Sequence, residues 1–287
     1  MSGLLNKIFF IIFLSLIPFK VFSEEKNSNF IKTNWTFSGL FGTFDRASLQ
    51  RGYQVYTEVC SGCHSVQHLS YRNLKEKGGP EFSEEEAKLI ASQFEVEDGP
   101  NSDGEMFMRP ARLSDKFVKP YPNVESSTAA NGGAYPPDMS VLAKARAGGA
   151  DYIYSLLLGY EDAPEGLELD DGVYYNKFMP GNKIKMSEPV YDGIVEYADG
   201  TPSSKEQVAK DVTAFLVWAS EPHLEAQHRM GFKTIVYLII LITLVYMSKQ
   251  KVWARFNPKS EEEKEEIFDK VEKVVTKYEG EDSKTFK

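Results

Sequence analysis

The chain has 287 residues, of which 42% are hydrophobic, and its formal net charge is −9 at pH 7. This length allows one sizeable core or two small domains. The negative charge is concentrated in residues 24–230, which hold 32 acidic and 20 basic side chains. It argues against nucleic-acid binding and for a cationic partner, with solubility as the alternative explanation. The two cysteines, Cys60 and Cys63, lie too close in sequence to form a disulfide framework.

The amino-terminal residues have the pattern of an export signal. Lys7 precedes an apolar run over residues 8–19, and compact residues follow at 21–23. We predict that residues 1–23 are a signal peptide, cleaved after Ser23. An uncleaved anchor helix is the alternative, but the apolar run has about 12 residues, whereas a membrane span takes about 20.

A first helix is predicted over residues 46–58, within an exported domain expected over residues 24–222. Asp45 is a suitable N-cap for this helix. A stripe of apolar side chains at i, i+4 and i+7 begins at Leu49 and marks its buried face. The helix leads directly into the sequence Cys-Ser-Gly-Cys-His at residues 60–64.

The Cys-x-x-Cys-His motif is the attachment signature of a c-type haem. Its spacing places two thiols, those of Cys60 and Cys63, on one turn, where they can add to the two vinyl groups of one haem. The imidazole of His64 then faces the iron. We therefore predict one covalent haem c, with His64 as an axial ligand.

Three other readings of the motif are weaker. A structural zinc site needs four ligands, and no second cysteine pair exists; His68 lies only one helical turn beyond His64. A thioredoxin-like redox pair is expected in a βαβ context, and the sequence does not show one. A disulfide across two intervening residues is strained. An export signal in front of the motif also favours haem attachment.

A haem that only moves electrons needs a second axial ligand, and methionine is the common partner of histidine. The methionines of the exported part are Met106, Met108, Met139, Met179, Met186 and Met230. Met179 and Met186 both lie in a Pro/Gly-flanked loop before the last soluble helix, and the residues alone leave the choice between them open. His223 and His228 are rival ligands, but they lie close to the second apolar segment.

Between the haem motif and the last soluble helix lies a long stretch rich in Gly and Pro, residues 75–200. We predict one helix within it over residues 83–94 and another over 138–158, the second capped by Asp138. The rest of the stretch is expected to form loops. Its acidic clusters could steer a basic partner: Glu84 to Glu86, Glu95 to Asp98, and Glu161 to Asp171.

The last soluble helix is predicted to begin at Ser204, with Gln207 three residues later in the manner of a capping box. Glu221-Pro222 marks its end, because proline removes a helix donor. An almost purely apolar segment then covers residues 232–247. We predict a transmembrane helix over residues 223–253, with a buried core helix as the alternative.

Basic residues follow the apolar segment, as the positive-inside rule expects on the cytoplasmic side: Lys249, Lys251, Arg255 and Lys259. Residues 254–287 are therefore expected to form a charged cytoplasmic tail. Within this tail, apolar side chains from Ile267 onward recur at helical spacing. They favour a short surface helix, with a frayed tail as the alternative.

Several further stretches occur with the haem motif in a distinctive order. They are CSGCH (60–64), MFMRPARLSDKFVKPYPN (106–123), NGGAYPPDMS (131–140), ARAGGADYIYSLLLGY (145–160), IKMSEPV (184–190), VEYADGTP (195–202) and QVAKDVTAFLVWASEP (207–222). Their order and spacing together resemble the cytochrome c1 family over roughly residues 35–253. The resemblance implies a mainly α fold: a cytochrome c-like haem domain with a long loop-rich insertion, plus one C-terminal transmembrane helix.

The resemblance also implies the roles of individual residues. It selects Met186 over Met179 as the second axial ligand, because the family places the ligand in this loop. It places Arg146 and Tyr152 beside the haem propionates. A surface arginine and a core aromatic are the ordinary alternatives for these two. It gives the lining of the haem pocket as Asn131, Pro136 and Pro137.

The implied function is electron transfer within a quinol–cytochrome c reductase. In the family, the haem accepts an electron from the Rieske iron–sulfur protein and passes it to a c-type cytochrome. The partners expected from the resemblance are cytochrome b, the Rieske protein and a basic c-type cytochrome, in a dimeric complex. The signal lacks an Arg/Ser-rich transit segment, which favours a bacterial inner membrane with the haem domain in the periplasm.

Three rival functions share part of this pattern. A free-standing, membrane-tethered carrier would have the motif and the anchor but would not need the long insertion. A haem peroxidase would need an open iron site, which methionine ligation closes. A scaffold subunit without redox function would not need an intact Cys-x-x-Cys-His.

Overall fold

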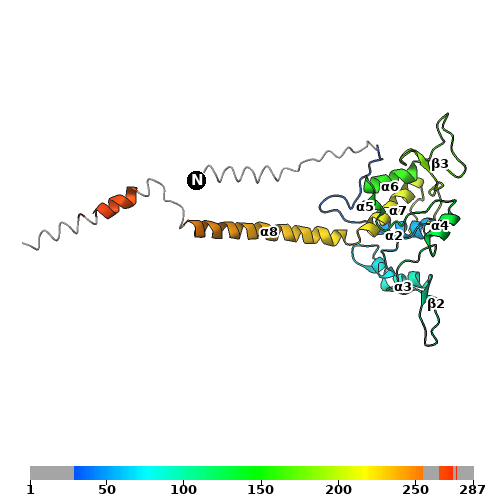
Figure 1. Cartoon of the computed structure of the whole chain (residues 1–287), viewed down its shortest axis with the longest axis horizontal. Coiled ribbons are helices and arrows are strands. Elements are labelled where there is room, and N and C mark those ends of the chain that lie inside the picture. Colours follow the sequence, from blue (N-terminus) through cyan, green and yellow to red (C-terminus); the bar gives the residue numbers. More distant parts are fainter. Residues whose placement is uncertain (1–28, 255–264, 274–275, 277–287) are drawn as a thin grey trace, which may run out of the picture. The chain divides into compact units, whose positions relative to one another are not determined.

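The structure is a computed structural model, and it describes residues 29–254, 265–273 and 276. The predicted signal peptide lies outside the described residues. The described residues divide into two compact units, one that ends at His228 and one that begins at Arg229. In the first unit the helices gather around a buried core, and loops and two small hairpins extend from it (Figure 1).

The first helix of the core, α2, covers Arg46–Val55. Asp45 caps it as predicted, because its Oδ1 accepts a hydrogen bond from the backbone N–H of Ala47 at 3.1 Å. Beyond α2 the chain forms a π-turn over Tyr56–Cys60 instead of continuing as an α-helix to residue 58. π-Turns of this kind insert one extra residue into the helical spiral and often lie at functional sites.

Helix α7 covers Lys205–Ser220, and its residues from Val208 to Ala219 are almost all buried. The Ser204 hydroxyl caps it by accepting from the N–H of Gln207 at 3.3 Å. Of the two bonds of the predicted capping box, only this one forms. The Gln207 side-chain amide donates to Asp211 Oδ2 at 2.9 Å instead of turning back to the start of the helix. The helix ends directly before Glu221-Pro222, as predicted.

Helices α2 and α7 pack closely at Gly52. A Cβ at this position would lie 2.1 Å from the Asp211 carbonyl oxygen and 2.7 Å from the Phe215 Cβ, so the approach needs a glycine. Aromatic rings fill the core next to it: the ring of Phe215 stacks on Tyr56 at 5.5 Å and meets the edge of Tyr53 at 5.8 Å. These contacts fix the end of α2 that leads into the haem motif.

A buried carboxylate joins the same two helices by charge. Asp211 is completely buried, and it accepts from Ser48 Oγ at 2.7 Å and from Arg51 Nε at 2.8 Å. The Arg51 side chain is 14% exposed and also reaches Asp199, whose side chain is 44% exposed, at 2.7 Å. The guanidinium is therefore shared between one buried and one exposed carboxylate.

The insertion after the haem motif has more regular structure than the sequence indicated. Helix α3 (Glu84–Ser92) is the helix predicted over 83–94. The other elements are η2 (Tyr71–Lys75), the antiparallel hairpin of β1 (Glu95–Asp98) and β2 (Phe107–Pro110), α4 (Val124–Ala130), and the two-residue strands β3 (Tyr174–Tyr175) and β4 (Lys183–Ile184). None of these elements was predicted from the sequence. Both described sheets have two strands, which confirms the mainly α class.

The single helix predicted over residues 138–158 is wrong. The structure has a short helix α5 (Leu142–Ala145) and a separate helix α6 (Gly149–Leu158). The break has a backbone cause: Gly148 and Gly149 have φ of +89° and +52°, a left-handed conformation that glycine adopts readily. Helix α6 then packs on α7 in the core (Figure 1).

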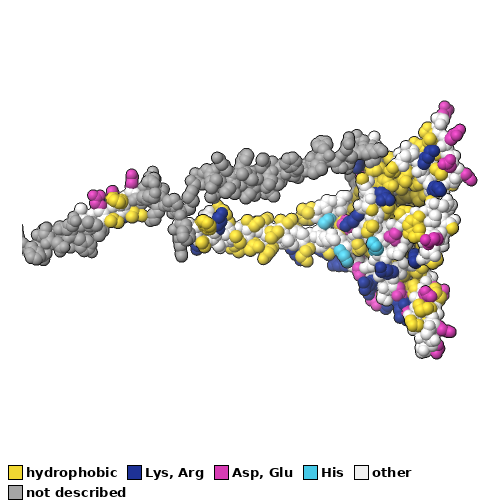
Figure 2. Space-filling view, in the orientation of Figure 1, with side chains coloured by type: hydrophobic (Ala, Val, Ile, Leu, Met, Phe, Trp, Pro, Cys, Tyr) yellow, Lys and Arg dark blue, Asp and Glu magenta, His cyan; other side chains and the backbone are white. Residues whose placement is uncertain are grey.

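Helix α8 covers Leu224–Trp253 and continues from the end of the first unit into the second. It is long and apolar enough to cross a membrane, and its most apolar stretch of 18 residues has a mean hydropathy of 2.0. Its side chains from 232 to 247 form an apolar surface (Figure 2). In the tail, residues 265–273 are helical, which agrees with the stripe that begins at Ile267.

The shared guanidinium of Arg51 gives a stability test. We expect Asp211→Asn to lower the free energy of unfolding by about 3 kcal/mol, because it leaves a buried guanidinium without its buried counter-charge. Asp199→Asn, which removes the exposed partner of the same arginine, should cost less than about 1 kcal/mol. Denaturant titration of the full chain in detergent, followed by tryptophan fluorescence, measures both. Equal losses in the two variants would contradict this account.

Candidate functional site

The haem motif lies at the end of the π-turn. The N–H of Ser61 bonds to the Tyr56 carbonyl at 2.8 Å, and the N–H of His64 bonds to the Cys60 carbonyl at 2.9 Å. Neither cysteine forms a disulfide. Cys60 packs against the core and Cys63 is exposed, so the two thiols differ in environment although they share one turn.

The His64 ring is held by a backbone carbonyl. Its Nδ1 lies 2.8 Å from the carbonyl oxygen of Pro137. A carbonyl oxygen can only accept, so Nδ1 carries the proton and Nε2 keeps its lone pair, as a metal-binding imidazole requires. Burial lowers the pKa of His64, against the opposing effects of Pro137 and Asp138, and this keeps the ring neutral near pH 7. Pro137, predicted as pocket lining, contributes its carbonyl.

Asp138 has a different role from the helix cap that the sequence predicted. Its carboxylate accepts from Ser65 Oγ at 2.6 Å and from the N–H of Gln67 at 3.1 Å. It also accepts from the N–H of Ser140 at 2.8 Å. Although burial acts in the opposite direction, the bonds from Ser140 and Ser65 lower the pKa of this carboxyl. The aspartate therefore fastens the segment after His64 to the segment that holds Pro137.

The environment of the thiols disfavours the rival readings of the motif. Burial, followed by the nearby charge of Cys63, raises the pKa of Cys60 to about 12, so its thiol is protonated at neutral pH. A redox-active pair needs a lowered thiol pKa. Among the described residues, no three His, Cys, Asp or Glu side chains form a group that could hold a metal ion. His68, the suggested partner for zinc, is exposed.

The candidate methionines fall into distinct environments. Met139 is buried in the core, whereas Met106 and Met108 are exposed at the β1–β2 hairpin, and Met230 is exposed on α8. Met179 and Met186 are half-buried. The hydroxyl of Tyr152 lies 4.0 Å from the sulfur of Met179, at the limit of a weak hydrogen bond.

The loop that carries Met186 is joined to three other parts of the first unit. The Tyr160 hydroxyl donates to the Met186 carbonyl at 3.0 Å. Lys185 Nζ donates to the Gly132 carbonyl at 3.0 Å, and Glu188 pairs with Lys205 at the start of α7. The loop is therefore connected to the residue after α6, to the turn after α4 and to α7.

The other predicted site residues are brought together only in part. Asn131 ends α4, where its side chain donates to the Ser127 carbonyl at 2.7 Å, and it lies next to the turn that Lys185 contacts. Tyr152 is buried in α6 beside Met179. Arg146 is exposed between α5 and α6; its Nη1 donates to its neighbour's carbonyl, and no described carboxylate pairs with it.

A cavity of about 330 Å³ opens beside Cys63. Its walls come from the haem motif and the residues after it, from residues 119–127, which run into α4, and from the residues before Pro137: Cys63, Ser65, Gln67, Lys119, Pro120, Tyr121, Pro122, Asn123, Val124, Glu125, Ser127, Tyr135 and Pro136. Residues 119–125 were not predicted as site residues. The repeated prolines of Lys119-Pro-Tyr-Pro were the available signal, because they indicate a fixed, extended wall.

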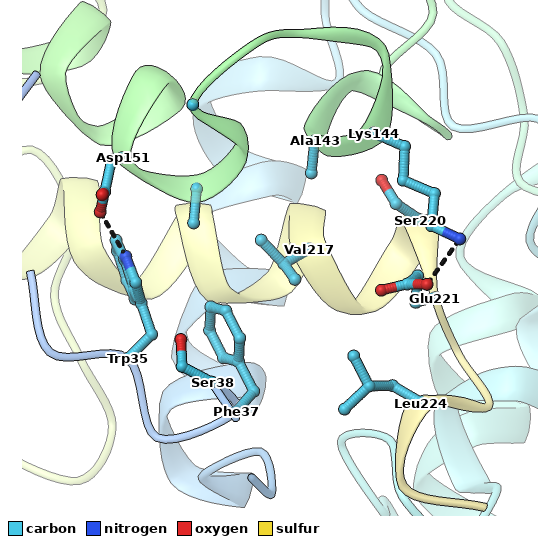
Figure 3. A pocket seen from close by; sticks show the side chains of 12 residues that line it. Trp35, Phe37, Ser38, Ala143, Lys144, Asp151, Val217, Ser220, Glu221 and Leu224 are labelled. Atoms are coloured by element: carbon cyan, nitrogen blue, oxygen red, sulfur yellow. Dashed lines mark hydrogen bonds and ion pairs between the residues drawn. The ribbon is translucent and has the colours of Figure 1, made fainter. Parts of the chain in front are cut away.

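A second cavity, of about 300 Å³, lies under the N-terminal segment (Figure 3). None of the predicted haem-site residues lines it. The Trp35 indole donates to Asp151 at 2.7 Å on one side, and Lys144 pairs with Glu221 at 2.5 Å on the other (Figure 3). The first interaction attaches the segment around Trp35 to α6, and the second joins α5 to the end of α7. We therefore assign this cavity to packing and take the cavity at Cys63 as the candidate functional site.

Comparison with known proteins identifies the family of this chain. A sequence model of the Cytochrome C1 family matches residues 35–256. The "Cytochrome b/c1" of Bradyrhizobium diazoefficiens is 46% identical over 77% of this chain, although the match spans only 35% of that protein. The "Cytochrome c1, heme protein, mitochondrial" of Schizosaccharomyces pombe is 48% identical over 80% of this chain and 74% of its own length. A "Cytochrome b-c1 complex catalytic subunit, mitochondrial" of Candida albicans is 45% identical over 78% of this chain. The chain therefore belongs to the cytochrome C1 family.

Proposed function

We propose that this chain carries one covalent haem c and transfers single electrons as a subunit of a cytochrome b–c1 complex. The observation that carries the proposal is the oriented imidazole of His64, directly after two unpaired thiols. Its Nδ1–H is committed to the Pro137 carbonyl, so only Nε2 remains for a metal.

The residues of the motif fit a haem. The two thiols lie within one turn of backbone, where one porphyrin can take both, and a cavity of about 330 Å³ opens beside Cys63. When bound, the haem supplies an iron that alternates between Fe(II) and Fe(III) and so carries one electron at a time. Cys60 and Cys63 would hold it covalently, and His64 would ligate the iron.

Met186 is the second axial ligand in this proposal. The sulfur of Met179 already contacts the Tyr152 hydroxyl, whereas the sulfur of Met186 has no hydrogen bond to a described residue. The family resemblance also places the ligand in this loop. Methionine opposite histidine raises the reduction potential, which suits an acceptor of electrons from an iron–sulfur protein.

Arg146, Tyr152 and Asn131 are proposed to serve the haem periphery. No described carboxylate pairs with the guanidinium of Arg146, so this group remains available to an anion such as a haem propionate. Tyr152 is a buried donor, and among the described residues its hydroxyl has only the weak sulfur partner of Met179. Asn131 and Pro137 belong to the turns next to Lys185 and His64.

The proposed partners follow from the names of the relatives. These describe a cytochrome b/c1 protein and a b-c1 complex subunit. We propose that this chain takes electrons from a Rieske iron–sulfur protein beside cytochrome b, in a dimeric complex. Helix α8 would anchor it in a bacterial inner membrane, with the haem domain in the periplasm and the basic tail on the cytoplasmic side.

A basic c-type cytochrome is the proposed electron acceptor, and the acidic loop over residues 161–171 is the proposed steering surface. Glu165, Glu168 and Asp170 are exposed in this loop, and no described cation pairs with their carboxylates, although Lys183 Nζ donates to the Glu168 backbone carbonyl at 3.0 Å. Acidic side chains gather at the edge of the unit near β3 (Figure 2). By contrast, Glu84 of α3 is paired with Lys75 and Lys88, so it contributes less negative electrostatic potential at the surface.

Replacing the proposed ligand tests the haem site. We expect Met186→Leu to lower the reduction potential by a substantial part of the roughly 0.8 V that axial ligands span, while the haem stays covalently attached. Met179→Leu is the matched control and should leave the potential nearly unchanged. Redox titration of the purified full chain measures both. A larger fall of the reduction potential in Met179→Leu than in Met186→Leu would show that Met179 is the iron ligand.

Electron delivery to a basic cytochrome c tests the function and its steering. We expect the bimolecular rate constant to fall roughly tenfold as ionic strength rises from about 10 mM to about 300 mM, since screening removes long-range attraction. At low salt, the triple change Glu165→Gln, Glu168→Gln and Asp170→Asn should slow transfer several-fold. Stopped-flow spectroscopy measures these rates.

The matched control neutralises three charges on α3 instead: Glu84→Gln, Glu85→Gln and Glu86→Gln. Because Glu84 is compensated by two lysines, and Glu86 caps the helix by accepting from the N–H of Ser83, this variant should change the rate much less. A rate that does not depend on salt would contradict steering, and failure to reduce any cytochrome c would contradict the proposed function.

A further inference from the structure

The hydroxyl of Tyr160 connects a rigid part of the fold to the methionine loop. It donates to the backbone carbonyl of Met186 at 3.0 Å, across 26 residues of sequence. We propose that Tyr160 is a positioning residue that holds this loop closed and thereby sets how much of the time Met186 stays on the iron. The inference rests on the proposed assignment of Met186 as the axial ligand.

Tyr160 itself is firmly placed. It follows helix α6 after Gly159, where a Cβ would lie 2.6 Å from the Phe178 ring and 2.7 Å from Asn176 Oδ1. Tyr160 forms an antiparallel β-bridge with Asn176, and the N–H of Lys177 donates to the Gly159 carbonyl at 3.0 Å. The end of α6 and the segment after β3 are therefore packed against each other.

Asn176 strengthens this support from inside the protein. Its side chain is completely buried, and its amide donates to the Leu156 carbonyl of α6 at 2.7 Å. Its Oδ1 accepts from the backbone N–H groups of Phe178 and Met179 at 3.0 and 3.2 Å. A buried amide whose oxygen and nitrogen are both hydrogen-bonded is rigid. Asn176 therefore holds the backbone at Tyr160 in place, and the tyrosine side chain reaches the loop from a fixed position.

The loop that receives this bond has little support of its own. Strand β4 ends at Ile184, and the next buried residue is Val190. Between them, Lys185 reaches Gly132 and Glu188 pairs with Lys205, and both interactions are at exposed positions. Exposed charged contacts contribute little to stability. The Tyr160 bond is partly buried, so it is the best shielded of the side-chain bonds that hold the loop.

The bond acts on the carbonyl of the ligand residue itself. A typical hydrogen bond contributes about 1 kcal/mol net, which corresponds to about a fivefold change in an equilibrium constant. Removing it should therefore raise the population in which Met186 has left the iron about fivefold. An added ligand that binds only this population will bind more tightly by the same factor.

The test is the affinity of the oxidised, haem-loaded full chain for imidazole, measured by absorption spectroscopy. We expect Tyr160→Phe to tighten apparent imidazole binding about fivefold, because the phenyl ring keeps the packing and loses only the hydroxyl. Tyr191→Phe is the matched control: Tyr191 lies 57% exposed after the same loop, and its hydroxyl has no described partner. It should leave the affinity unchanged.

Met186→Leu separates failure of this inference from failure of the proposed function. This variant should bind imidazole with the affinity of a site in which residue 186 never occupies the iron. If it does so while Tyr160→Phe binds imidazole like the wild type, Tyr160 does not position the ligand, although Met186 remains the ligand. If Met186→Leu itself leaves imidazole binding unchanged, the assignment of Met186 is wrong. A lower unfolding midpoint of Tyr160→Phe with unchanged affinity shows a purely structural role and overturns the inference.

Discussion

The hydrogen bond from the His64 ring to the Pro137 carbonyl is the constraint on which the proposed iron site depends. It joins residues 73 positions apart and fixes both the tautomer and the orientation of the imidazole. Two thioether bonds alone would hold a porphyrin but would leave the imidazole free to turn. Asp138 keeps the two joined segments in register through Ser65 and Gln67, so the carbonyl stays where the ring needs it.

The two axial sides of the proposed site are supported unequally. On the histidine side, the motif grows out of α2, which is packed on α7 at Gly52 and joined to it through Asp211. The π-turn then places Cys60 against the core and leaves Cys63 exposed. On the methionine side, a loop without regular structure depends on a few bonds, of which that from Tyr160 is the best shielded.

Local signals predicted the parts of the fold that depend on local chemistry. The caps Asp45 and Ser204 and the apolar α8 are decided within a few residues, and the sequence was sufficient for them. Asp138 shows where it was not: an aspartate before a helical stretch indicates a cap, but besides the nearby N–H of Ser140 its carboxylate binds partners more than 70 residues away. In the site, the motif spacing indicated His64 as the proposed haem ligand. The role of Tyr160 had no sequence signal, because its partner is a backbone carbonyl.

The most direct test of the account is a reduced-minus-oxidised spectrum of the chain, tagged at its C-terminus and purified in mild detergent from its native membrane. The account predicts a c-type band together with b-type haem from the co-purified partner, and haem that stays on this chain under denaturing electrophoresis. A c-type band without b-type haem would contradict stable membership of the complex. A chain that carries no covalent haem would contradict the central claim.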